Sequence, residues 1–276
     1  MELVATSSAA KRAALQTLVD PDAPSAQRAL AVLRGEASGV SWLDAGAPTA
    51  RGVVHERSFG LTFFLGHQSM GELVAMLQWT RETVAAEATS AAKPLPSEGH
   101  THVEMWDGDP RIERMPEPTV FGRSVVFDGG HRTSALPALP SGLSLVPVDA
   151  DLFQRAEWRQ DQIDIFGSET SFFEHGWGRF LMRGDRILCE TYAEFRADGR
   201  WEVGVVTREG ERGNGYAHLT CSHLLAELEG RGYEAIWHAA ESNEASLALA
   251  RKLGFRRERH GPLFCYEPPT GVTPQS

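Results

Sequence analysis

The feature that most constrains this chain is a strand, a glycine-rich turn and a helix within residues 201–229. Within 201–207, Val203 and Val205 alternate with Glu202 and Gly204, which predicts a strand. From Ala217 onward, the apolar residues recur at helical spacing, which predicts a helix. Between them, Gly213 and Gly215 leave backbone N–H groups unshielded where the helix begins. Such a helix start binds anions, phosphate above all. The alternative is that these glycines only form a tight turn.

The rest of the C-terminal half extends this unit into a mixed sheet. We expect the strand–helix–strand segment 201–239 to form a βαβ unit with parallel strands and a right-handed crossover. A hairpin is predicted around Gly184 and Asp185. Strands are predicted at 143–148, 178–183, 186–195, 201–207, 233–239 and 263–266, and helices at 150–165, 168–174, 217–229 and 243–253. The fold class is therefore α+β, mostly antiparallel with one parallel pair, in a domain over 142–268.

Residues 1–141 are predicted to form a separate N-terminal domain of mixed α/β structure. Helices are expected at 9–18, 25–33 and 69–89, and strands at 50–55, 61–65, 100–106 and 119–127. Ser25 is the expected N-cap of the second helix, and Ser69 with Glu72 forms a capping box for the third. The Pro- and Gly-containing stretch 137–142 marks the domain boundary. We find no internal repeat, and residues 269–276 are predicted to be disordered.

Composition excludes several classes of function. The formal net charge of -10 argues against nucleic acid as a partner, and an acidic surface would tolerate a cationic or amine substrate. No run of 18 or more apolar residues indicates a membrane span, and no secretory signal is recognised at the N-terminus. Cys189, Cys221 and Cys265 are scattered and odd in number, which is typical of buried thiols in a reducing compartment. We expect a cytoplasmic protein.

The glycine turn resembles the signature of the GNAT superfamily of acyl-CoA N-acyltransferases, Gln/Arg-x-x-Gly-x-Gly/Ala. The six positions are residues 210–215, where both glycines match and Gly210 departs from the pattern. Val206-Thr207 before the turn, Tyr216-Ala217 after it, and Asn243 with Lys252-Leu253-Gly254-Phe255 downstream also match. The resemblance covers residues 143–267. The N-terminal half carries no recognised signature, and one hypothesis is that it is a degenerate half-copy of the same fold.

The resemblance implies acetyl-CoA as co-substrate, without a metal. Its pyrophosphate would lie on the N–H groups of 212–217, and its pantetheine arm would pair with the strand at 205–207. The cofactor-binding residues so implied are Val205, Val206, Thr207, Arg212, Gly213, Asn214, Gly215, Tyr216, Ala217, Asn243 and Ser246.

The activity implied is direct transfer of an acetyl group to a primary amine of a small molecule. The N-terminal domain would then wall one side of the acceptor site. Two alternatives stay open: an N-acetyltransferase acting on a protein amine, and a catalytically silent acyl-CoA-binding or regulatory protein. A homodimer is an open alternative to a monomer.

Two residues are candidates for the base that deprotonates the amine. Glu202 is the first, since many members of the family keep a glutamate there; the alternative is a structural carboxylate paired with an arginine. His238 is the second, and its alternative is a hydrogen-bonded histidine in a half-buried layer. Glu190 and Glu194 could reach substrate, but a solvated face is the favoured interpretation.

The proton donor to the leaving thiolate is less clear. The tyrosine usual in the family falls at Ala250, so Tyr216, Ser242, Ser246 or water would have to substitute.

One further pattern could bind a metal. His100, His102 and Glu104 alternate along a predicted strand and would share a face. Since no other ligand spacing supports this trio, we predict no metal site.

Overall fold

The computed structural model describes residues 1–6, 8–47, 49–90, 99–127 and 136–269. The chain forms two compact units. The N-terminal unit comprises Met1–Ser124 together with His260–Ser276, and the C-terminal unit comprises Val125–Arg259.

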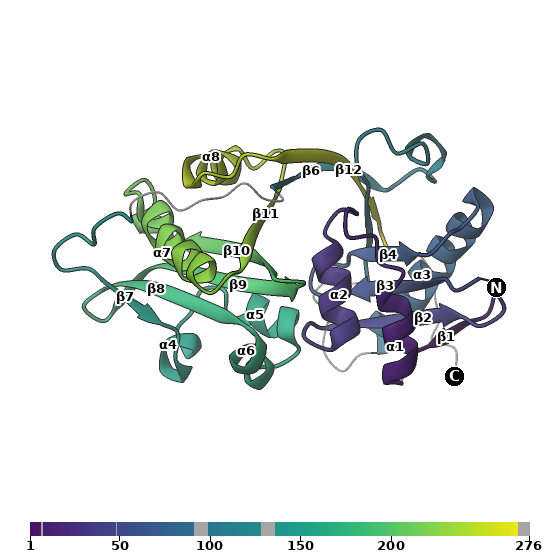
Figure 1. The fold of residues 1–276 in the computed structure, drawn as a ribbon, viewed down its shortest axis with the longest axis horizontal. Helices are drawn as coiled ribbons and strands as arrows, with labels where there is room; N and C mark the ends of the chain where they lie inside the picture. The colour runs from purple at the N-terminus through teal and green to yellow at the C-terminus, as the bar shows by residue number, and fades with distance from the viewer. Residues whose placement is uncertain (7, 48, 91–98, 128–135, 270–276) are drawn as a thin grey trace. The chain divides into compact units, whose positions relative to one another are not determined.

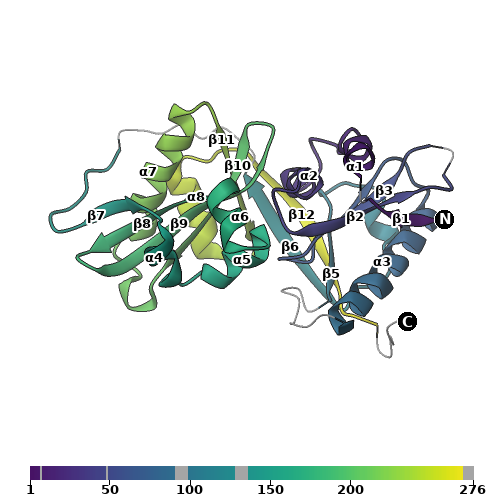
Figure 2. The same ribbon diagram turned by 90° about the horizontal axis from the view of Figure 1, so that it is seen from below.

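The N-terminal unit is built on a four-stranded antiparallel sheet in the order β1-β2-β3-β4. Helices α1 and α2 cover one face of this sheet and α3 covers the other (Figures 1 and 2). Trp42 of β2 and Val53 of β3 pack against Met76 and Val84 of α3. The elements are β1 (Leu3–Ala5), α1 (Ala9–Gln16), α2 (Ala26–Arg34), β2 (Gly39–Asp44), β3 (Gly52–Glu56), β4 (Thr62–Leu65), α3 (Met70–Ser90), β5 (Thr101–Glu104) and the 3-10 turn Ile112–Arg114.

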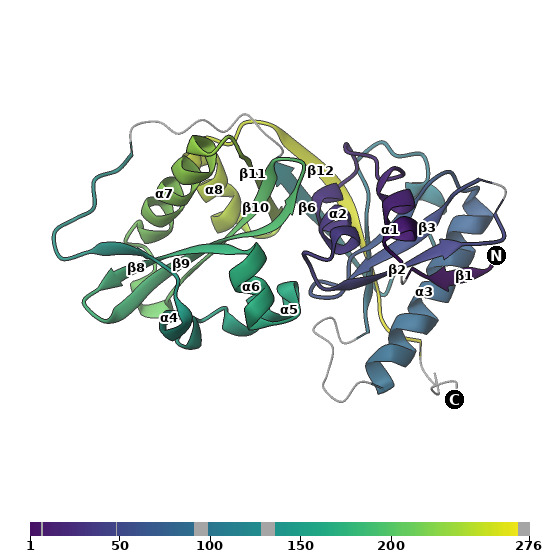
Figure 3. The same cartoon turned by 60° about the horizontal axis from the view of Figure 1, so that its bottom comes forward.

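The C-terminal unit contains the strand order β11-β10-β9-β8-β7, with β10 and β11 parallel and the other pairs antiparallel. Helices α7 and α8 cover one face, and α4, α5 and α6 the other (Figure 3). Its elements are β7 (Ser144–Pro147), α4 (Ala150–Gln154), α5 (Arg159–Phe166), α6 (Glu169–His175), β8 (Trp177–Arg183), β9 (Arg186–Ala197), β10 (Arg200–Thr207), the 3-10 turn Glu209–Glu211, α7 (Tyr216–Gly230), β11 (Glu234–Ala240) and α8 (Glu244–Leu253). The predicted α+β class, with one parallel pair, is confirmed.

Strands β6 (Val120–Phe127) and β12 (Glu258–Tyr266) each have residues in both units. The division therefore differs from the predicted domains 1–141 and 142–268. The reason is that β12 pairs antiparallel with β5, from Leu263 opposite Glu104 to Tyr266 opposite Thr101. This pairing returns the C-terminal strand to the N-terminal unit.

The two units share one order of elements: a strand, helices, three antiparallel strands, a helix and a strand. In the N-terminal unit this is β1, α1–α2, β2–β4, α3 and β5, and in the C-terminal unit β7, α4–α6, β8–β10, α7 and β11. The sequence shows no internal repeat, but the two units share this order of elements. This shared order agrees with the hypothesis that the N-terminal half is a degenerate half-copy of the same fold. The order of elements is not visible as a residue-by-residue similarity between the two halves.

Some local predictions also need correction. Strands β1 and β2 were not predicted, and the single helix expected at 150–165 is divided into α4 and α5. The division arises because the backbone N–H groups of Glu157 and Trp158 donate to the buried carboxylate of Glu190 instead of to a helix. Ser25 precedes α2 as predicted, but its side chain makes no cap and donates to Glu104.

The start of α3 differs in chemistry from its counterpart α7. The predicted capping box is present, since Glu72 accepts from the backbone N–H of Ser69 and Ser69 accepts from the N–H of Glu72. Arg51 binds the other oxygen of Glu72 and also binds Asp44 at 2.7 Å. The start of α3 therefore already carries a carboxylate of the chain itself, paired with an arginine.

Replacing Glu72 by glutamine is expected to lower stability in a pH-dependent way. The hydrogen bond from Arg51, followed by those from Ser69, lowers the pKa of Glu72 from 4.5 to about 2. Because the folded-state pKa lies below the unfolded one, the stabilisation is complete above about pH 4.5 and is lost as the pH falls toward 2. Thermal unfolding of wild type and Glu72→Gln should thus differ most near pH 7, differ less as the pH falls below about 4.5, and converge only at about pH 2. A difference that stays constant with pH would contradict this origin.

Candidate active site

The C-terminal unit contains a cavity of about 850 Å³ between β10 and β11. These parallel strands pair only from Arg200 opposite Glu234 to Glu202 opposite Ile236. Beyond this point, Val203–Thr207 and Trp237–Ala239 line the cavity instead of pairing with each other. The other edge of β10 stays bonded to β9 as far as Thr207 opposite Cys189. One backbone edge of β10 is thus available to an extended ligand.

The glycine turn places an open helix N-terminus against this cavity. Gly213 and Gly215 have φ of 81° and 78°, a left-handed conformation that favours glycine, and an added Cβ at either would meet no atom within 4 Å. Gly215 is the N-cap of α7, and no side chain in the described part of the chain caps this helix. The first backbone bond of the helix runs from Leu219 N–H to Gly215. The three preceding N–H groups, which belong to cavity-lining residues, are available to an anion.

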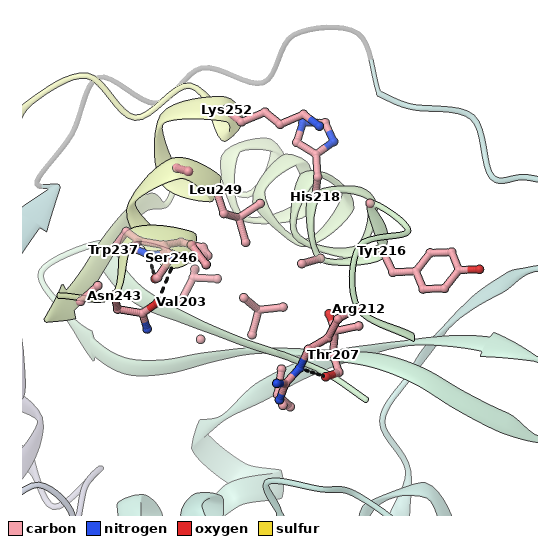
Figure 4. Close-up of a pocket in the computed structure, with 18 of the residues that line it drawn as sticks. Val203, Thr207, Arg212, Tyr216, His218, Trp237, Asn243, Ser246, Leu249 and Lys252 are labelled. Carbon is pink, nitrogen blue, oxygen red and sulfur yellow. Dashed lines mark hydrogen bonds between the residues drawn. The ribbon is translucent and has the colours of Figure 1, made fainter. Parts of the chain in front are cut away.

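The start of α8 forms the opposite wall. Asn243 caps α8 as predicted, accepting from the backbone N–H of Ser246 at 3.1 Å. The indole N–H of Trp237 donates to the Ser246 hydroxyl oxygen at 2.9 Å, so the hydroxyl hydrogen can be donated elsewhere. Figure 4 shows these three side chains grouped on one side of the cavity.

A histidine and a lysine lie together at another part of the wall. His218 of α7 and Lys252 of α8 both line the cavity, and their side chains approach each other in Figure 4. Burial lowers the pKa of His218, and the positive charge of Lys252 lowers it further. The pKa of His218 thus lies below its usual value, and the lysine beside it can bind an anionic group.

Every predicted cofactor-binding residue except Asn214 lines the cavity. The amide of Asn214 instead donates to the carbonyl of Glu211 within the turn. The ring of Tyr216 extends away from the α8 wall, and its hydroxyl accepts from Arg183 at 2.6 Å. Other residues that line the cavity were not predicted to bind the cofactor: Glu157, Trp158, His218, Ala245, Leu249 and Lys252. Of these, Lys252 belongs to the matched family motif, whereas no local motif marks Glu157, Trp158 or His218, which line the cavity only because distant elements pack together.

The two candidate bases form a pair. His238 lines the cavity, whereas Glu202 is 4 % exposed and lies behind the wall. The Nδ1 atom of His238 is 3.8 Å from Oε1 of Glu202. Glu202 therefore lies close enough to His238 to interact with the charged form of its imidazole.

Glu190 does not lie on a solvated face, which corrects the favoured interpretation. It is 1 % exposed and binds Arg208 at 2.8 Å, the hydroxyl of Tyr192 at 2.9 Å and the two backbone N–H groups between α4 and α5. Burial, with the negative charge of Glu190, raises the pKa of Tyr192 well above its ordinary value. Glu190 therefore organises the α4–α5 loop. Glu194 is also buried, at 6 % exposed.

The other candidates have structural positions. Ala250 is fully buried in the core among Leu247 and Leu253, so the position usual for tyrosine packs against apolar side chains.

Burial raises the pKa of the Cys189 thiol to about 11 and that of Cys221 further, which makes both poor nucleophiles at neutral pH. All three cysteines are free thiols, and Cys265 is only half-buried.

The residues of the candidate metal trio have other partners. Glu104 accepts from the hydroxyls of Ser25 and Ser124, and His102 shares a hydrogen bond with the carbonyl of Phe59. Among the described residues, no group of three or more metal-ligating side chains gathers. Within the same ranges, no helix is long and apolar enough to cross a membrane.

The fold and the site define a class of protein: a sheet opened between two parallel strands, with an uncapped helix N-terminus facing the opening. A family model described as GNAT acetyltransferase matches residues 38–264, which is most of the chain. The chain belongs to the GNAT acetyltransferase family. The predicted resemblance to this family is confirmed. The match begins at residue 38, so it extends further toward the N-terminus than the predicted range 143–267.

Individual relatives agree with this assignment. An uncharacterized N-acetyltransferase of Bacillus subtilis (strain 168), YdfB, is 28% identical over 120 residues, which are 43% of this chain and 46% of that protein. The chain therefore spans about half the length of this curated relative. A GCN5-related N-acetyltransferase-like protein from Streptococcus suis 89/1591 has a TM-score of 0.62 at 18% identity, covering 93% of this chain and 99% of the other. A tandem GNAT protein from the clavulanic acid biosynthesis pathway has a TM-score of 0.62 at 13% identity, covering 100% and 99%. The last two show a shared fold.

Proposed function

We propose that the protein is an acetyl-CoA-dependent N-acetyltransferase that acetylates a primary amine of a small molecule. The observation that carries the proposal is the meeting of two backbone features in one cavity. The uncapped N-terminus of α7 suits a pyrophosphate, and the unpaired edge of β10 suits an extended chain bearing amide groups.

Acetyl-CoA would bind along this cavity in an extended form. Its pyrophosphate would lie on the N–H groups that follow Gly215, and its pantetheine amides would bond the free edge of β10 at Val205–Thr207. The ammonium group of Lys252 would attract a phosphate group. No metal is required in this arrangement, because the helix N-terminus and the lysine supply the positive potential.

The proton handling follows from which side chains reach the cavity. We assign the base to His238, which faces the acceptor, and assign Glu202 to holding the imidazole and stabilising its charged form. The Ser246 hydroxyl, which accepts from Trp237, would donate to the leaving sulfur. An attacking amine nitrogen then forms the amide bond as the carbon–sulfur bond breaks, with its proton passing to His238.

A Ser246→Ala change is expected to lower kcat by about tenfold while the affinity for acetyl-CoA stays within about twofold. The reason is that the hydroxyl would act on the developing thiolate rather than on the bound thioester. Single-turnover release of the thiol, together with calorimetric binding, separates these two effects. An equal loss in both would assign Ser246 to cofactor binding alone.

The proposal is tested by measuring acetyl-CoA affinity and thiol release with a panel of amines. Tight binding with turnover on small amines supports it. Turnover only on peptide or protein amines would favour a protein N-acetyltransferase, and tight binding without turnover on any amine would favour a silent acyl-CoA-binding protein. The three free thiols agree with the cytoplasm as the proposed location, and sedimentation would distinguish a monomer from a homodimer.

A further inference from the structure

A second buried carboxylate, that of Glu194, lies on the strand that pairs with the strand of Glu202. Between the pairs Trp201–Arg196 and Val203–Ala193, strand β9 carries Glu194 and one further residue opposite the single residue Glu202 of β10. This is a β-bulge, a feature that re-aims side chains beside functional sites. Both Glu194 and Glu202 are buried, and they belong to this irregular stretch of the two strands.

Glu194 has a buried amide as its neighbour. Gln162 of α5 is fully buried and donates from Nε2 to Oε1 of Glu194 at 2.7 Å. Its Oε1 atom is also buried, and no donor for it exists among the residues that the structure describes. Exchanging the amide nitrogen and oxygen would turn the oxygen toward a carboxylate, which repels it, so the orientation is fixed by Glu194. An amide oxygen is thus left beside a carboxylate oxygen, and both are acceptors.

The carboxylate of this pair lies directly behind a residue that lines the cavity, although neither Glu194 nor Gln162 lines it. The glycine of β10 that lines it, Gly204, lies against Glu194: a Cβ at this position would be 3.0 Å from Oε1 of Glu194 and 3.1 Å from Cζ3 of Trp158. Trp158 lines the same cavity. The absence of a side chain at Gly204 therefore leaves the carboxylate within reach of a ligand that enters beside Trp158.

Resting on the proposed function, we propose that the acceptor enters as a primary ammonium ion with an apolar or aromatic substituent, held by Glu194 and Gln162. An ammonium has three donors and can donate to both the carboxylate and the amide oxygen, whereas an alcohol has one donor. The substituent lies along Trp158, whose ring favours apolar groups and cations. Glu194 and Gln162 act as binding and positioning residues, and His238 takes the proton.

The neighbouring charges favour a monoamine over a polyamine. The other carboxylates near the loop, Glu157 and Glu190, are both bound by Arg208, at 3.3 and 2.8 Å. A second ammonium would have to displace that arginine. A single charge at Glu194 leaves these pairs intact.

The test uses the full chain and matched probes. Binding of 2-phenylethylamine, 2-phenylethanol and spermidine is measured by calorimetry with and without coenzyme A, and thiol release from acetyl-CoA is measured with each amine. Wild type is expected to bind 2-phenylethylamine at least about tenfold more tightly than the alcohol and than spermidine. An amine that binds no better than its alcohol overturns the proposal without any variant.

Variants then locate the site. Glu194→Gln and Gln162→Met are each expected to weaken binding of 2-phenylethylamine, and to raise its KM where it turns over, by about tenfold or more. The acetyl-CoA affinity should stay within about twofold, and kcat should change less than KM. The control is Glu258→Gln, since Glu258 is bound to Arg251 at 2.7 Å and does not line the cavity. It should leave amine binding unchanged.

The outcomes separate the inference from the proposed function. Weak acetyl-CoA binding by wild type would contradict the proposed function. The comparison of amine and alcohol binding without coenzyme A would still test whether Glu194 binds an ammonium group. Unchanged amine binding in both variants overturns the inference, and an unfolded Glu194→Gln leaves Gln162→Met to decide. Equal losses in amine binding and acetyl-CoA binding, with a lowered thermal midpoint, assign the pair a structural role and also overturn it.

Discussion

Replacing Gly213 by aspartate is expected to weaken binding of acetyl-CoA by about 100-fold or more. Gly213 has a φ of +81°, which costs an ordinary residue about 1–2 kcal/mol, so the turn is strained by any side chain. The added carboxylate would stand in the cavity at the start of α7, where the pyrophosphate is proposed to lie. Like charges then oppose each other at the point where binding depends on an open positive helix terminus. Calorimetry on the purified variant measures the loss.

The matched control for this change is Gly210→Asp. Gly210 belongs to the same turn, does not have a positive φ, would meet no atom within 4 Å and does not line the cavity. The same charge placed there should change acetyl-CoA affinity by less than about threefold, since it is solvated. Equal losses in both variants would indicate a general effect of charge and would contradict the site. Unchanged binding in Gly213→Asp would remove the pyrophosphate position altogether.

The contrast between the two helix starts explains why one unit alone is assigned the cofactor. At the start of α3, Glu72 accepts from the backbone N–H of Ser69, Ser69 accepts from the N–H of Glu72, and Arg51 binds the same carboxylate, so the chain's own acidic group lies at this helix terminus. In α7, Gly215 caps the helix and leaves the N–H groups for a ligand. Both units keep the same order of elements, so the difference in chemistry comes from the residues of one turn.

The sequence predicted the glycine turn and the helix starts that line the cavity well, because their signals are local. A glycine turn, a capping asparagine and strand periodicity each lie within a few residues, and all three were confirmed as structure at Gly213, Gly215 and Asn243. The acceptor side could not be predicted in this way. Gln162 meets Glu194 only because α5 packs on β9, and the bulge that aims Glu194 depends on pairing with β10.

The structure of the N-terminal half was harder to predict, because there too the decisive contacts are not local in the sequence. Strands β1 and β2 carry weak alternation, and what relates this half to the other is the order of elements, which no residue pattern displays. Ser25 shows how a local signal can point to the right position with the wrong partner. It precedes α2, yet its hydroxyl binds Glu104, 79 positions along the chain. Non-local contacts decided these cases.

A His238→Ala change is expected to lower kcat by about 100- to 1,000-fold while acetyl-CoA affinity is retained. The imidazole faces the cavity, so its loss removes the group that would take the amine proton. Glu202→Gln should cost less, about tenfold, because it keeps a hydrogen-bonding group 3.8 Å behind the imidazole and removes only the charge. Single-turnover thiol release with the best amine of the panel measures both, and added imidazole should partly restore His238→Ala. If Glu202→Gln instead shows the larger loss and imidazole restores nothing, then the carboxylate is the base, reaching the amine through water, and His238 only shapes the wall between them.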